Sequence, residues 1–127
     1  MIDFDCYCDD GEQSVIYEKT TPKARIQHKC SECFAPIAAG EAYERVVGLW
    51  PSCDGWETFK TCARCIALRE FVKSNVKCFC WNHGNMISDA LETADHYRDP
   101  GNGLYFGALR RYALIQRHRK ANASGVR

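Results

Sequence analysis

Cysteine is the residue type through which this chain has most scope for chemistry. The sequence contains nine cysteines, and four of them form two C-x-x-C pairs, Cys30 with Cys33 and Cys62 with Cys65. A spacer of two residues lets both sulfurs of a pair turn toward the same ion, so two pairs can supply four thiolates to one tetrahedral Zn²⁺. We therefore predict a first zinc site at these four residues.

Disulfides and redox chemistry are the alternatives for these pairs. The chain starts without the basic and apolar regions of a signal peptide, its cysteine count is odd, and disulfides persist mainly in oxidising compartments. A redox C-x-x-C of the thioredoxin type lies near a βαβ pattern, which this sequence lacks. Metal binding is favoured, and four protein sulfurs would close the coordination sphere, so the zinc would be structural.

Two C-x-C pairs predict a second zinc site. Cys6 and Cys8 lie near the N-terminus, and Cys78 and Cys80 follow the second C-x-x-C pair. Together they would tie an N-terminal strap to the later segment and close a long loop. Because one intervening residue in an extended strand points two side chains apart, two alternatives stay open: buried free thiols, or a site in which His83 replaces one sulfur.

The segment between the C-x-x-C pairs would position the first site. Residues 41–50 and 56–61 predict two strands of a hairpin, joined by a turn that contains Cys53, which we expect to be a free thiol. Thr61 is the expected N-cap of a helix over 62–74, whose positive end would stabilise ionised sulfur. A cysteine knuckle, a hairpin and a helix in this order predict a treble-clef zinc finger.

Two more helices are expected in the rest of the chain. Apolar residues recur at helical spacing over 86–98 and again from Leu104, with a strong break at 99–103. The predicted fold is a small, zinc-stabilised α+β structure: a treble clef followed by a C-terminal helical pair. We divide it into a zinc-binding core with its strap, 1–83, and a C-terminal helical segment with a basic tail, 84–127.

Charge is distributed unevenly along a chain whose formal net charge is +1. Residues 1–18 are acidic without any Lys or Arg, and from Gly101 onward there is no acidic residue. Basic side chains on the last helix could bind phosphates or a protein partner, although a solvated helix face would explain them equally well. These candidate binding residues are Arg110, Arg111, Arg117, Arg119 and Lys120.

Aromatic side chains near the cysteines could stack on bases, but such residues more often form the core around a zinc site. We expect most of them to be core residues, unless Trp50 and Trp56 are exposed beside the hairpin turn. The set comprises Phe34, Trp50, Trp56, Phe59, Phe79 and Trp81.

A metal-dependent nuclease of the HNH type is a further alternative, since Asn82-His83-Gly84-Asn85 is similar to fragments of nuclease motifs. That chemistry needs a general-base histidine and more His, Asn or Asp ligands on the hairpin and helix. No histidine lies between Cys33 and Cys62. We therefore rank the nuclease last and expect His83 to be a structural residue.

Several short motifs of the cysteine-rich segment form a distinctive set: Cys30-x-x-Cys33-x-x-x-Ile37-x-x-Gly40-Glu41-x-Tyr43, Thr58-Phe59-Lys60-Thr61-Cys62-x-x-Cys65, Ala67-Leu68-Arg69, Cys78-Phe79-Cys80-Trp81 and Gly84-Asn85-Met86. With these motifs the segment resembles a group of small zinc-binding proteins encoded by tailed bacteriophages and prophages. The resemblance implies a phage accessory protein that acts in the bacterial cytoplasm, and it supplies no catalytic motif.

Together these features predict a non-enzymatic zinc-binding interaction module that binds nucleic acid or a host protein. The alternative is an inhibitor of a host defence complex or polymerase that acts by protein contact. The sequence indicates no small-molecule substrate, and no apolar run approaches the length of a membrane span. We expect a cytoplasmic protein.

Overall fold

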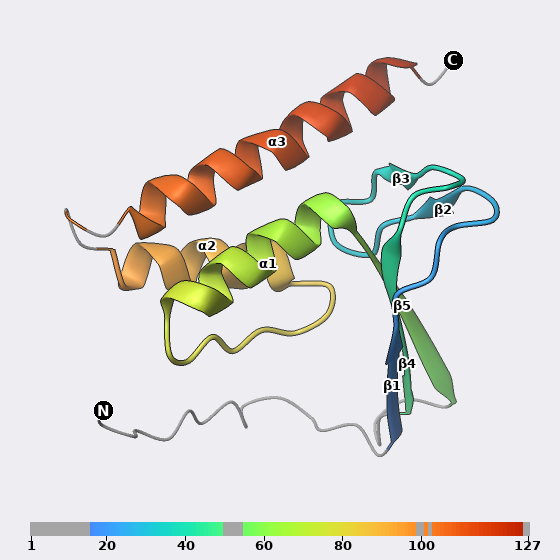
Figure 1. Ribbon diagram of the computed structural model, residues 1–127, viewed down its shortest axis with the longest axis horizontal. Coiled ribbons are helices and arrows are strands. Elements are labelled where there is room, and N and C mark those ends of the chain that lie inside the picture. The colour runs from blue at the N-terminus through green and yellow to red at the C-terminus, as the bar shows by residue number, and fades with distance from the viewer. Residues whose placement is uncertain (1–15, 50–54, 99–100, 102, 126–127) are drawn as a thin grey trace.

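An antiparallel sheet and a group of three helices lie at different ends of the molecule in a computed structural model of the chain (Figure 1). The structure describes residues 16–49, 55–98, 101 and 103–125. It confirms the predicted α+β class.

The larger sheet holds strands β1 (Ile16–Thr20), β4 (Tyr43–Leu49) and β5 (Trp56–Cys62) in the order β1-β4-β5. Both pairings are antiparallel, and Tyr43 lies opposite Cys62 at the end of the β4–β5 hairpin that leads into the first helix. The hairpin therefore delivers one cysteine to the end of the sheet nearest the helices.

A second, two-stranded sheet frames the first C-x-x-C pair. Strand β2 (His28–Lys29) pairs with β3 (Pro36–Ile37). The turn between them, residues 30–35, contains Cys30 and Cys33 and is called the cysteine turn. After β3 the chain turns at Gly40, whose φ of +94° lies in the region that favours glycine.

The helices are α1 (Ala63–Asn75), α2 (Met86–His96) and α3 (Leu104–Gly125). Figure 1 shows α3 extending beyond α2, past the start of α1 and toward the small sheet. In the described ranges, no helix is both long and apolar enough to cross a membrane.

The predicted elements are all present, with shifts at their ends. The first predicted strand begins two residues later than expected, and α2 ends two residues earlier than expected. The predicted cap at Thr61 is wrong: Cys62 occupies the N-cap position of α1, with no side-chain capping hydrogen bond. Because Thr61 still pairs with Glu44 in the hairpin, the helix cannot begin until the strand ends.

One buried cluster joins the cysteine turn to all three helices. The inner face of α1 is formed by Cys65, Leu68 and Val72, which are fully buried. Met86 from α2 and Ile115 from α3 belong to the same cluster. The core therefore lies directly beside the cysteines, so that packing of the helices fixes the position of the site.

Candidate metal centre and its surroundings

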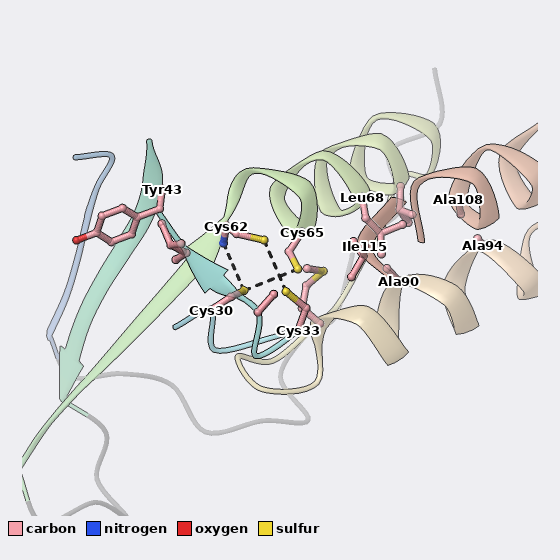
Figure 2. Close-up of a cluster of buried hydrophobic side chains, with 14 of the residues drawn as sticks. Cys30, Cys33, Tyr43, Cys62, Cys65, Leu68, Ala90, Ala94, Ala108 and Ile115 are labelled. Atoms are coloured by element: carbon pink, nitrogen blue, oxygen red, sulfur yellow. Dashed lines mark hydrogen bonds between the residues drawn. The ribbon is translucent and has the colours of Figure 1, made fainter. Parts of the chain in front are cut away.

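Four buried cysteines converge between the small sheet and the start of α1 (Figure 2). Their Sγ atoms all lie within 4.8 Å of one another, and the Sγ–Sγ distances from Cys30 to Cys65 and from Cys33 to Cys62 are both 3.8 Å. All four are free of disulfides. The predicted first site is thus a Cys₄ cluster that can hold a metal ion.

Backbone contacts hold the cysteine turn against the hairpin. Ser31 donates its N–H to the carbonyl of Lys60 at 2.7 Å, and its Oγ accepts the Lys60 N–H at 2.9 Å. This reciprocal pair places Cys30 beside Cys62, whose own N–H donates to the Cys30 Sγ at 3.4 Å. A second N–H, from Glu32, donates to the same sulfur at 3.4 Å.

The ionisation of the four sulfurs is strongly coupled. Hydrogen bonds from Cys33, Cys62 and Cys65 lower the pKa of Cys30. The same hydrogen bonding to Cys30 raises the pKa of Cys65, because one thiolate opposes a second beside it. A divalent cation removes this opposition by binding all four thiolates, with release of their protons.

Glu32 joins the cysteine turn to helix α2. Its buried carboxylate accepts the backbone N–H groups of Gly84 at 2.8 Å and Met86 at 3.1 Å. These N–H groups stand at the start of α2, where backbone donors have no partner within the helix and the positive end of the dipole favours an anion. Burial raises the pKa of Glu32 despite these hydrogen bonds.

Half of the predicted second site lies outside the described residues, because it needs Cys6 and Cys8. The other half is described: the Sγ atoms of Cys78 and Cys80 lie 3.6 Å apart. The intervening segment is a loop and not an extended strand, so the C-x-C spacing here brings two sulfurs together. Both cysteines are disulfide-bonded in this structure, so the alternative of free thiols is wrong for them and neither sulfur can bind zinc in this state. Cys53 also falls outside the described part.

His83, the predicted substitute ligand, lies on an aromatic side of the sheet. Its ring stacks on Phe59 with centroids 4.5 Å apart and meets the edge of Trp81 at 4.8 Å. Burial lowers the pKa of His83. Its Nδ1 is buried and has no hydrogen-bond partner within the described residues. In this part of the chain the only group of three or more His, Cys, Asp or Glu side chains arranged for a metal is the Cys₄ cluster.

The basic residues of α3 divide into two groups. Arg111 packs its guanidinium over the ring of Phe71 on α1, 3.8 Å from the centroid, and donates to the carbonyl of Gly107. It therefore belongs to the α1–α3 contact. The side chains of the other four are exposed: Arg110, Arg117, Arg119 and Lys120.

A groove runs between the cysteine turn and the C-terminal part of α3. It has a volume of about 560 Å³, and its lining includes Phe34, Arg119, Lys120 and Asn122. A second hollow of about 220 Å³, near the start of α2, shares Phe34 and Arg119 with it. The groove and the second hollow therefore lie on either side of the Phe34 ring and the Arg119 guanidinium.

The expectation that most of the aromatics form core fails at two positions. Phe34 is 59% exposed and Trp56 is 58% exposed, whereas Phe79 and Trp81 pack against the core. Trp50 lies outside the described residues. Sequence reasoning also missed Glu32, since its partners are more than 50 residues away in the chain and no local pattern marks them.

Comparison with protein-family models, with curated proteins and with solved structures found no match to the chain.

Proposed function

We propose that this protein is a non-enzymatic, zinc-stabilised module of the treble-clef type that binds nucleic acid. The groove between the cysteine turn and α3 would be its binding surface. The observation that carries the proposal is that this groove is lined by Arg119 and Lys120 and by no carboxylate among the described residues.

Zinc is the metal that the Cys₄ geometry favours. At a Zn–S distance of about 2.3 Å, the edge of a regular tetrahedron is about 3.8 Å. The Sγ–Sγ distances from Cys30 to Cys65 and from Cys33 to Cys62 have this value. Four thiolates in tetrahedral array suit zinc or an iron–sulfur centre, and elemental analysis of the purified protein distinguishes the two.

The order of the elements supports the treble-clef assignment. A turn with the first cysteine pair is followed by the β4–β5 hairpin and by α1, which carries Cys65 in its first turn. In such an arrangement the ion has four protein ligands and no open position for water. The metal would therefore hold the turn and helix together, and binding would fall to the surface around them.

Charge supports a polyanionic partner for this surface. From Gly101 to the C-terminus the chain has no acidic residue. Lys29, at the edge of the cysteine turn, is exposed and adds a third cation, with its Nζ 5.3 Å from the ring centroid of Phe34. Glu32 lines the neighbouring hollow, but its carboxylate is already hydrogen-bonded to two backbone N–H groups. Phosphates of a bound nucleic acid could therefore pair with these cations without competition from a protein carboxylate in the groove.

The test is a salt titration of binding by fluorescence anisotropy, with a labelled oligonucleotide. Neutralising both groove cations, Arg119→Gln with Lys120→Gln, should weaken binding and reduce the slope of log K against log salt by about 1.4 on a single strand, since each lost phosphate contact removes about 0.7. The matched control is Lys23→Gln with Arg45→Gln, which makes the same charge change at a separate hollow beside β4.

Equal loss in the two double variants would mean that binding depends on net charge and not on the groove. No binding at about 50 mM salt, where phosphate contacts are strong, would overturn the proposal. In that case a pull-down of a stable partner would favour the alternative, an inhibitor of a host complex. The resemblance to phage proteins would place either role in the cytoplasm of an infected bacterium.

A further inference from the structure

Phe34 occupies a position that neither local geometry nor core packing explains. Its φ is +64°, in the left-handed region, and its N–H donates to the carbonyl of Cys30 at 3.0 Å to close the turn. This conformation is unfavourable for a bulky side chain and costs nothing for glycine. Burial does not compensate, because the side chain is 59% exposed. Strain retained at an exposed residue points to a role at the surface.

The ring of Phe34 is surrounded by groups that suit a nucleotide. Lys29 approaches it from the small sheet, and Arg119 lies in the lining of the hollows on either side. Asn122 and Asn85 each line one of these hollows and can donate to and accept from base edges. A site for single-stranded nucleic acid combines an aromatic ring on which a base stacks with cations that contact the phosphates of the nucleic-acid backbone. Amide groups that can bond to base edges complete such a site.

A duplex would use these groups less well. Its bases are stacked on one another, so their faces cannot reach an aromatic ring, and its phosphates would contact only the cations. An acidic peptide would likewise engage the cations and leave the ring without a stacking partner. The ring is thus the group that distinguishes the three possible occupants.

We propose that Phe34 is a stacking platform for unpaired bases and that the groove selects single-stranded nucleic acid. This inference rests on the proposed nucleic-acid binding and names the class of substrate for the same surface. Lys29, Arg119 and Lys120 would contact the phosphates on both sides of the stacked base.

The decisive variant is Phe34→Gly. It removes the ring and relieves the positive φ, so the thermal unfolding midpoint of the metal-loaded protein should stay the same or rise. Affinity for an oligothymidine of about 16 nucleotides should fall by about 10-fold, because stacking contributes strongly for each base. Phe34→Trp is the matched control, since it keeps a ring at the same place and should preserve the affinity.

The salt dependence separates this inference from the proposed function. Phe34→Gly keeps every cation, so its log K against log salt slope should match that of the unchanged protein. Binding that is equally tight for a duplex of the same length, or unaffected by Phe34→Gly, would overturn the stacking inference and leave nucleic-acid binding standing. No binding to either oligonucleotide at about 50 mM salt would overturn both. A competition experiment gives a further test, in which polyglutamate displaces oligothymidine from the unchanged protein and from Phe34→Gly. If the same concentration of polyglutamate is needed for both proteins, the surface is purely electrostatic and the stacking inference is overturned.

Discussion

The guanidinium of Arg69, on α1, meets the carboxylate of Glu44, on β4, through two hydrogen bonds of 2.7 and 2.6 Å. Both side chains are almost fully buried, at 6% exposure for Arg69 and 3% for Glu44. Trp81 lies 5.3 Å from the guanidinium carbon, and Glu70 accepts a further hydrogen bond from its Nε. The pair links the sheet to the helix that carries Cys65.

Removing one partner of this pair should destabilise the fold strongly. Arg69→Met would leave the Glu44 carboxylate buried, and the ion pair that remains to it among the described residues is the one with Lys19, 3.9 Å away. We expect the free energy of unfolding to fall by about 3–5 kcal/mol in urea titration. The double variant Glu44→Gln with Arg69→Met should be more stable than Arg69→Met alone. Equal stability of the two would mean that the buried charge is not the cause.

The same pair predicts a loss of stability in acid. Burial alone would raise the pKa of Glu44, but the hydrogen bonds and charge of Arg69 outweigh it, so the pKa lies below its usual value. The unfolded chain then binds the proton more readily, and the stability contributed by Glu44 is present above a pH of about 4.3 and is lost as the pH falls below it. Glu44→Gln lacks this contribution. The difference in unfolding free energy between the unchanged protein and Glu44→Gln should therefore shrink as the pH falls. Both proteins have the same cysteines, so the pH dependence that the cysteines cause cancels in this difference.

The first site was predictable from local spacing, whereas its supports were not. The two-residue spacer of each C-x-x-C pair lets both sulfurs face one ion, and this depends on local geometry alone. The alternating and helical patterns also placed the hairpin and α1 to within a few residues. The Glu44–Arg69 pair and the contact of Glu32 with the start of α2 depend on how distant segments pack. Phe34 was misassigned to the core because hydrophobicity predicts burial, while the positive φ of its turn is visible only in the structure.

Glu32 should stabilise the start of α2. Glu32→Gln replaces one carboxylate oxygen with an NH₂ group, which cannot accept the N–H of Gly84 or Met86. We expect a loss of about 1–3 kcal/mol, the cost of leaving a buried donor without a partner. Hydrogen exchange at the amide that loses its acceptor should accelerate before global unfolding. Glu92→Gln, at an exposed position of α2, is the control and should change neither quantity.

Metal content tests both predicted sites. Because a disulfide sulfur does not bind zinc, the second site requires reduced Cys78 and Cys80. We expect two zinc ions per chain by native mass spectrometry of protein purified under reducing conditions, falling to one in Cys6→Ser and in Cys78→Ser. Cys30→Ser should instead remove the first ion and unfold the α1 end of the core, since structural zinc supplies folding energy directly. A single zinc that neither Cys6→Ser nor Cys78→Ser affects would refute the second site. Thiol alkylation without reductant then reports whether Cys78 and Cys80 are held in disulfides.

The contact between α1 and α3 should not accept an added methyl group at Gly107. A Cβ added there would overlap the ring of Phe71, which Arg111 covers one helical turn further along. Gly107→Ala would normally stabilise a helix by about 1 kcal/mol. Overpacking typically costs about 1–3 kcal/mol, so we expect a net loss of stability in denaturant titration. Phe71→Leu should reverse the sign, because its smaller side chain leaves room for the methyl group. A stabilising effect of Gly107→Ala in the unchanged background would mean that the two helices can separate at no cost, and that α3 is held in place mainly by Ile115 and its neighbours in the core.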